Sequence, residues 1–246
     1  MPTRPEDWIV PDWPVAEHVR ALITSRNGGA SVGPYTSMNL GTRVDDAPNA
    51  VDANRRLLKH FLPAEPRWLD QVHGTTVVTA ESVTLPVRAD AAVTKSPGCV
   101  SVVMVADCLP ILFADRAGSV VGVAHAGWRG LAGGVIENTV RALDTRPHNL
   151  YAYLGPAIGP SAFEVGNDVR DLFIAADQAA DHAFHPYKPD KWLADLFVLA
   201  RQRLNRCGVR NVYGGGLCTF SDPARFFSHR RDKVSGRMAA LIWIED

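Results

Sequence analysis

The sequence predicts an α+β fold in which strands and helices follow one another without strict alternation. Short β-branched segments bounded by Gly, Pro or Asp indicate strands, and segments with apolar residues every three or four positions indicate helices. The chain has 246 residues, 46% of them hydrophobic. This length and composition suffice for a sizeable core, and we expect one domain over residues 1–246.

The predicted elements begin with a strand at residues 19–25 and a helix at residues 46–61, which prolines end. The segment at residues 99–106 is almost continuously apolar, which is typical of a strand covered on both faces. The further predicted strands are 75–80, 89–94, 111–114, 119–125, 151–154 and 238–244, and the further predicted helices are 128–143, 167–176 and 191–207.

Charge and composition exclude several classes of protein. Lysine plus arginine equals aspartate plus glutamate, 26 each, so no net field would draw the chain onto nucleic acid or an anionic membrane. The N-terminus has no apolar signal segment, and no stretch approaches the roughly 18 apolar residues of a membrane span. We therefore expect a cytoplasmic protein with neither nucleic acid nor membrane as partner. The four cysteines form no CxxC pair, which argues against a disulfide framework.

Three short motifs carry side chains suited to metal binding or nucleophilic chemistry. They are DQVHG at residues 70–74, ADCLP at 106–110 and HAGWRG at 125–130. His73, Cys108 and His125 would give a zinc ion three ligands and leave its fourth position open for a reactant. Because their spacings do not force them to meet, a packed or hydrogen-bonded role remains the alternative for each one alone.

Neighbouring residues suggest how such a site is supported. A ligating imidazole usually donates its other N–H to a carboxylate or carbonyl, which makes Asp107 and Asp70 candidates. A turn role is the preferred interpretation for Asp70, and both interpretations stay open for Asp107. Arg129, next to the glycines of HAGWRG, suits a phosphate or carboxylate, unless those glycines serve packing alone.

The C-terminal stretch CTFSDPARFFSHRRDKVSGR combines arginines, including Arg230, with paired phenylalanines. Such a stretch suits the wall of a pocket for a ring that carries phosphate. The alternative is that the paired arginines form a solvated edge or salt bridges.

Six motifs follow one another along the chain: RNGGASVGPYTSMNLG, DQVHG, ADCLPILF, HAGWRG, LGPAIGPSAFEVG and FFSHRRDKVSGR. In this order they resemble one bacterial family, described first as polyphenol oxidase or laccase domain and later as multifunctional purine nucleoside phosphorylases. The resemblance implies an αββα-type sandwich of layered mixed β-sheets flanked by outer helices. It also implies zinc on His73, Cys108 and His125, with copper in the family's older description. The implied activity is phosphorolysis of adenosine, inosine and methylthioadenosine, with adenosine deamination, so the expected partners are purine nucleosides and phosphate.

The resemblance also guides the choice of substrate residues. One departure is that Asn39-Leu40-Gly41 is followed by Thr42-Arg43, where relatives commonly have a histidine. Arg43 retains the ability to bind phosphate. The residues we expect to bind substrate or phosphate are Asn39, Arg43, Gln71, Asp107, Arg129 and Arg230.

Rival functions differ in what they require of the same residues. A four-copper laccase needs about ten histidine and cysteine ligands, whereas this chain has eight histidines and no HxH pair; phenol oxidation remains an alternative only through the older family description. The HxE and PCxxC signature of nucleobase deaminases is missing. A stronger rival is a hydrolase of aberrant cell-wall precursors with Cys108 as nucleophile and His125 or His73 as base. A non-enzymatic, zinc-stabilised binding module is a further rival.

Overall fold

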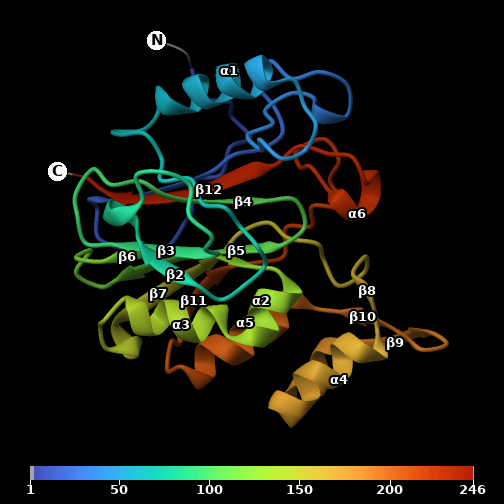
Figure 1. Cartoon of the computed structure of the whole chain (residues 1–246). Coiled ribbons are helices and arrows are strands. Elements are labelled where there is room, and N and C mark those ends of the chain that lie inside the picture. The colour runs from blue at the N-terminus through green and yellow to red at the C-terminus, as the bar shows by residue number, and fades with distance from the viewer. Residues whose placement is uncertain (1–2, 246) are drawn as a thin grey trace.

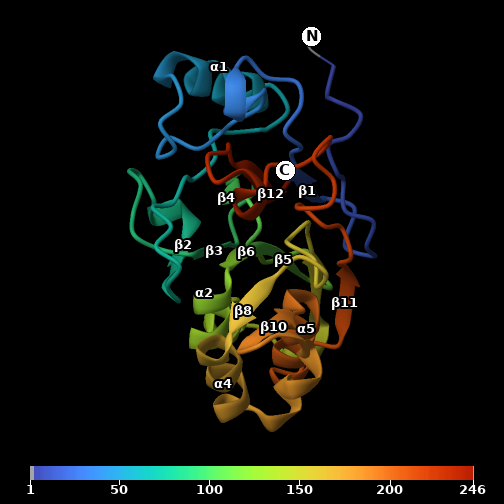
Figure 2. The same cartoon turned by 90° about the vertical axis from the view of Figure 1, so that its right-hand side faces the viewer.

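The computed structural model describes residues 3–245 and stacks two β-sheets between outer helices (Figure 1). A three-stranded sheet has the order β1-β12-β4, and a six-stranded sheet has the order β11-β7-β5-β6-β3-β2. Helix α1 covers the outer face of the first sheet, and α3 and α5 cover the outer face of the second (Figures 1 and 2). This arrangement confirms the predicted α+β fold with helices outermost.

The three-stranded sheet is antiparallel, with the C-terminal strand at its centre. Its strands are β1 (Val19–Ile23), β12 (Met238–Ile244) and β4 (Ser101–Val105). Val102 packs on the side of α1 (Pro48–Lys59), whereas Val103 packs toward the six-stranded sheet. The strand is therefore covered on both faces, as its apolar sequence predicts.

The six-stranded sheet is built around an antiparallel hairpin of β5 and β6, in which every residue is buried. Leu112 and Val123 face the three-stranded sheet, while Ile111 and Phe113 face the helices. The strands of this sheet are β2 (Val77–Thr79), β3 (Ala91–Thr94), β5 (Leu109–Asp115), β6 (Val121–Ala126), β7 (Leu150–Leu154) and β11 (Asn211–Gly214).

Two predicted helices differ from the structure. The helix expected over residues 128–143 is divided into α2 (Trp128–Gly133) and α3 (Val135–Ala142), because Gly134 has φ +102 and ends the first helix. The helix expected over residues 191–207 begins late. Asp195 caps α5 (Leu196–Arg206) by accepting N–H bonds from its first turn.

The segment before that cap belongs to a third, small sheet that projects at the opposite end of the molecule from α1 (Figures 1 and 2). Its strands are β8 (Glu164–Gly166), β10 (Lys191–Ala194) and β9 (Phe184–Lys188), and α4 (Asn167–Ala176) lies beside it. Pairing with β8 and β9 therefore overrides the helical pattern of residues 191–194. The remaining short elements are α6 (His229–Asp232) and the 3-10 turns Gly33–Tyr35, Ala80–Ser82, Pro147–Asn149 and Gln178–Ala183.

None of the helices within residues 3–245 combines the length and the apolar character that crossing a membrane requires.

Candidate metal and substrate site

Three side chains from distant parts of the chain meet at one end of the β5–β6 hairpin. Cys108 directly precedes β5, His125 lies in β6 opposite Pro110, and His73 comes from the loop before β2. Their ligand atoms all lie within 4.8 Å of one another. The predicted meeting of the three side chains is thereby confirmed. The pairing of β5 with β6 brings Cys108 beside His125, and the loop before β2 adds His73.

The donor set of this cluster fits a zinc ion. Two imidazoles and one thiol are the ligand types that zinc prefers, and three protein ligands are typical of its catalytic sites. Burial is graded, because His125 is buried, Cys108 is half-buried and His73 is exposed. Within residues 3–245 no fourth His, Cys, Asp or Glu side chain belongs to the cluster, and all three of its residues line the cavity described below.

The cluster favours the thiolate form of its cysteine. Burial opposes ionisation, but the charge of His125 and hydrogen bonds from both histidines lower the pKa of Cys108 to about 6. Burial likewise opposes the charged imidazole, yet Cys108 and Asp90 raise the pKa of His125 to about 9. Without a metal ion the pair is therefore a thiolate beside an imidazolium, and the sulfur is already in its ligating form.

Asp90, which the sequence analysis missed, is the carboxylate that holds His125. Its Oδ1 lies 2.8 Å from Nδ1 of His125, and the side chain is completely buried. Burial raises the pKa of Asp90, but hydrogen bonds from His125 and from backbone N–H groups outweigh it, so the pKa is lowered. The sequence offered Asp107 and Asp70 as candidates for this role, with a turn role preferred for Asp70; the structure assigns it to Asp90 instead, because only the pairing of β3 with β6 brings this carboxylate to His125.

Asp107 instead fastens the C-terminal segment to the turn that presents Cys108. Its carboxylate accepts hydrogen bonds from Oγ1 of Thr219 at 2.6 Å and from the N–H of Arg230 at 2.6 Å. Its carbonyl accepts from the N–H of Ile158 at 2.9 Å. Asp107 has φ +89, a conformation that a non-glycine residue keeps only with such support.

Asp70 forms an ion pair with Arg43 rather than contacting a histidine. The arginine side chain is 73% exposed and the carboxylate 16% exposed. The pair links the loop that follows Gly41 to the loop that carries His73. This contact goes beyond the turn role preferred from sequence for Asp70.

A cavity of about 600 Å³ opens beside the cluster. Arginines dominate its charged lining, and aromatic rings of Trp68, Trp128 and Phe163 add apolar surface. This composition suits an anionic reactant that carries a ring. Of the predicted substrate residues, the cavity is lined by Arg43, Gln71, Asp107, Arg129 and Arg230.

Asn39 is the predicted substrate residue that the structure does not bring to the lining of this cavity in the described chain. It is fully buried, and its Oδ1 accepts hydrogen bonds from the N–H groups of Gly41 and Arg237. Its Nδ2 donates to Asp46. Asn39 therefore supports the cavity wall by holding the backbone of Gly41 and Arg237, two residues that line the cavity.

Gln71 is also engaged with the backbone. Its amide donates to the carbonyl of Met104 at 2.8 Å and accepts from the N–H of the same residue at 2.7 Å. This reciprocal pair ties the loop of His73 to β4.

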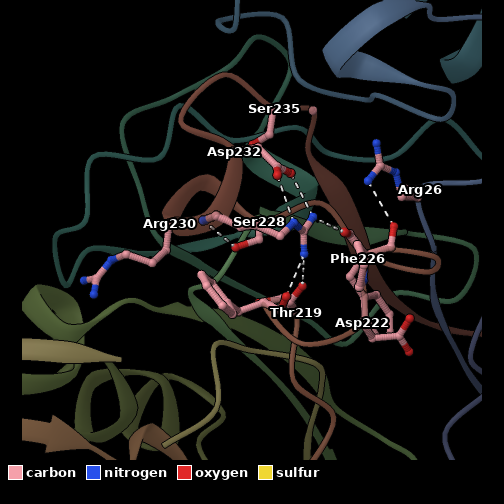
Figure 3. A network of polar contacts seen from close by, with 12 residues as sticks. Arg26, Thr219, Asp222, Phe226, Ser228, Arg230, Asp232 and Ser235 are labelled. Atoms are coloured by element: carbon pink, nitrogen blue, oxygen red, sulfur yellow. Dashed lines mark hydrogen bonds and ion pairs between the residues drawn. The ribbon is translucent and has the colours of Figure 1, made fainter. Parts of the chain in front are cut away.

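The two arginines of the C-terminal motif have different roles. Arg231 donates to the carbonyls of Thr219, Phe220 and Phe226 and so holds its own segment together. Arg230 extends away from that network (Figure 3), and its guanidinium donates to the carbonyl of Glu164. Arg230 thus reaches the cavity wall, as the pocket interpretation of this motif predicts.

Two further cations of the lining were missed. Arg237 is half-buried, and burial lowers its pKa while the nearby acidic groups Cys108 and Asp107 oppose that effect. Arg55 stacks on Trp68, with 3.9 Å between the guanidinium carbon and the ring centroid. Arg237 lies in a quoted motif, but neither residue has a local signal that distinguishes it from a surface arginine.

Known proteins match this chain along nearly its whole length. A profile of the family described as multi-copper polyphenol oxidoreductase laccase matches residues 20–245. Purine nucleoside phosphorylase PA4543 of Pseudomonas aeruginosa is 53% identical over 240 residues, which cover 97% of this chain and 99% of that protein. Purine nucleoside phosphorylase YfiH of Escherichia coli is 50% identical over 240 residues, covering 96% and 98%.

Solved structures agree with these matches. Neisseria meningitidis protein NMB0706 superposes with a TM-score of 0.95 at 49% identity, covering 98% of this chain and 100% of that one. YlmD from Geobacillus stearothermophilus superposes with a TM-score of 0.86 at 32% identity, covering 94% and 93%. The layered fold and the three-donor cluster define an α+β protein with a metal-capable site. The chain belongs to the multi-copper polyphenol oxidoreductase laccase family, in which the relatives from P. aeruginosa and E. coli carry the name purine nucleoside phosphorylase.

Proposed function

We propose that this protein is a zinc-dependent purine nucleoside phosphorylase. It converts adenosine, inosine and methylthioadenosine with phosphate to a sugar 1-phosphate and the free base, and it deaminates adenosine as a side activity. The observation that carries the proposal is the cavity of about 600 Å³ that joins the His73-Cys108-His125 cluster to a wall of arginines and aromatic rings. The names of relatives about half identical in sequence support it.

His73, Cys108 and His125 are the residues that would hold the zinc ion. When bound, the ion supplies a Lewis acid that polarises an oxygen of phosphate or water. The chain's own contribution begins with the thiolate of Cys108, which supplies negative charge. Asp90 keeps the imidazole of His125 directed toward the sulfur.

Phosphate binding in this proposal depends mainly on Arg129. Its guanidinium lies over the ring of Trp128 at 4.2 Å and has no hydrogen-bond partner among residues 3–245. Its N–H groups are therefore available for a phosphate oxygen. Arg43 and Arg230 line the same cavity and neutralise remaining charge, although each already has one protein partner.

The chemistry of phosphorolysis matches this division of the cavity. A phosphate oxygen forms a bond to the anomeric carbon while the bond to the purine nitrogen breaks, and the base leaves with that electron pair and takes up a proton. Arginines hold the attacking anion, and the rings of Trp128 and Phe163 offer faces to the purine. In deamination water replaces phosphate and ammonia leaves the ring, so both reactions use one cavity.

The test incubates purified protein with adenosine, with and without phosphate, and separates adenine from inosine by chromatography. Phosphate-dependent adenine is the expected main product, and phosphate-independent inosine is the expected minor one. Cys108→Ala should lose bound zinc and at least about 100-fold in both activities while keeping its fold. Cys207→Ala is the control, because this cysteine ends α5 away from the cavity. Full turnover by a metal-free Cys108→Ala protein would refute the assignment.

One observation favours a second candidate, the cysteine hydrolase. The lowered pKa of Cys108 beside His125 is what a thiolate nucleophile with an imidazole partner requires. Stoichiometric zinc and inhibition by chelators would support the phosphorylase. A metal-free enzyme inactivated by thiol alkylation would support the hydrolase. The binding-module alternative is disfavoured, because residues 3–245 supply no fourth ligand to close the site.

A further inference from the structure

A single buried carboxylate touches both histidine-bearing segments of the cluster. Oδ1 of Asp90 accepts hydrogen bonds from the N–H of His73 at 2.9 Å and from Nδ1 of His125 at 2.8 Å. Its Oδ2 accepts from the N–H groups of Val72 at 3.2 Å and Gly74 at 2.6 Å. Three consecutive backbone N–H groups and one imidazole therefore converge on one side chain.

The loop at His73 depends on this carboxylate for its shape. His73 has φ +59, a left-handed conformation that is uncommon for a residue other than glycine. Successive N–H groups that converge in this way form an anion-binding concavity, and here the anion is Asp90. Removing the charge replaces one of its two acceptor oxygens and weakens the bonds that balance the unfavourable backbone conformation.

The same carboxylate decides which ring nitrogen of His125 faces the cluster. Asp90 accepts three N–H bonds from the backbone, which favour its ionised form, and an ionised carboxylate can only accept. Nδ1 of His125 must then carry the hydrogen, and Nε2 is presented to Cys108. The backbone reinforces this arrangement, because the N–H of His125 donates to the carbonyl of Asp90 at 2.7 Å.

We propose that Asp90 is a positioning residue that couples the two histidines, setting the loop conformation of His73 and the tautomer of His125 together. His73 and His125 therefore reach the geometry for binding zinc together, and neither reaches it alone. This inference rests on the metal site in the proposed function and is independent of the substrate that the cavity accepts.

Asp115 provides a matched control at the other end of the same hairpin. It is also a buried aspartate and accepts hydrogen bonds from the N–H and Oγ of Ser119 and from the N–H of Val120. Its partners belong to a turn of residues 115–120. Asp115→Asn therefore removes a comparable buried charge without touching a histidine.

The experiment compares wild-type protein, Asp90→Asn and Asp115→Asn by zinc competition against a chromophoric chelator. Asp90→Asn should weaken zinc binding about 10- to 100-fold, and the amides of residues 72–74 should exchange hydrogen faster. Asp115→Asn should lower the midpoint of thermal unfolding but keep zinc affinity within about threefold of wild type, because its partners lie in a turn that holds no ligand. Equal zinc affinity in Asp90→Asn and Asp115→Asn would overturn the proposal.

A second variant keeps the test decisive if Asp90→Asn does not fold. Asp90→Glu retains the charge but moves the carboxylate by one methylene, so it cannot keep all four short bonds. It should still weaken zinc binding and alter the visible spectrum of the cobalt-substituted protein. An unchanged zinc affinity and cobalt spectrum would contradict the proposal. Wild-type protein that binds zinc but lacks nucleoside activity would refute the proposed function and leave this inference standing.

Discussion

Each end of the β5–β6 hairpin has a buried aspartate, but the two aspartates serve different purposes. At the closed end, Asp115 satisfies the turn that follows it, and Gly118 with φ +69 completes that turn. At the open end, Asp90 accepts hydrogen bonds from the backbone of a neighbouring loop and from one ring nitrogen of His125. Both aspartates are buried and both accept several hydrogen bonds.

The difference lies in what remains after these bonds are made. At the closed end the side-chain hydrogen bonds of Asp115 all stay within the turn. At the open end three donor atoms, from His73, Cys108 and His125, remain directed at one another beside a cavity. The functional site therefore consists of polar groups that the fold holds in place while their ligand atoms remain free to bind.

The largest expected effect comes from filling the space beside the thiol. A Cβ at Gly127 would lie 2.8 Å from Sγ of Cys108 and 3.2 Å from Cδ2 of His73. The backbone of Gly127 is extended with φ −64, so alanine fits its conformation but not its surroundings. Gly127→Ala should weaken zinc binding at least about tenfold, as chelator competition would measure.

Gly118→Ala is the counterpart at the closed end. Its φ of +69 disfavours a side chain, and a Cβ would lie 2.4 Å from Nε2 of His18. This variant should lose about 1 to 3 kcal/mol of unfolding free energy and retain zinc affinity. If both glycine variants lost zinc equally, the contrast between the two ends would fail.

An intermediate effect is expected in the pH dependence of thiol alkylation. In chelator-treated protein the pKa of Cys108 is about 6, so its thiolate fraction rises through pH 6 and is nearly complete above about pH 7. Burial raises the pKa of Cys207, so its alkylation should still be rising at pH 9. Peptide mapping after timed alkylation should find Cys108 about tenfold more modified at pH 7. Parallel profiles for the two cysteines would contradict the electrostatic description of the cluster.

The smallest effect is expected at the rim of the cavity. Arg43 is largely exposed and its pair with Asp70 is screened by solvent, so Arg43→Gln should change stability by less than about 0.5 kcal/mol. If Arg43 binds phosphate, the KM for phosphate should rise about threefold with kcat nearly unchanged, since the lost interaction is present before the reaction. Steady-state kinetics at varied phosphate would show this. An unchanged KM would remove Arg43 from the phosphate site.

Local patterns in the sequence predicted the elements that one stretch of chain determines by itself. The helix at residues 167–176 and the strand at 238–244 have the predicted bounds. The error at residues 191–194 has a different origin. Those residues carry a pattern compatible with a helix, and only pairing with β8 and β9 makes them a strand.

The residues of the site also fall into those that a local motif identifies and those that only the fold identifies. The three ligand candidates were recognisable because each stands in a motif beside a turn. Asp90 was not, because it stands in an ordinary strand-like segment and becomes important only when β3 pairs with β6, Ala91 opposite Ala124. Asn39 shows the converse, since a motif residue proves to be a buried support of the wall.

The sequence by itself determined the kinds of side chain, the turns that carry them and the order of the motifs, because these depend on neighbours along the chain. Tertiary structure alone decided which carboxylate serves which imidazole, which arginines reach the cavity and which end of a hairpin stays open. Those outcomes follow from strand register and burial. Hydrogen-bond partners 17 and 35 residues apart, as for Asp90 with His73 and His125, are selected only when the sheets assemble.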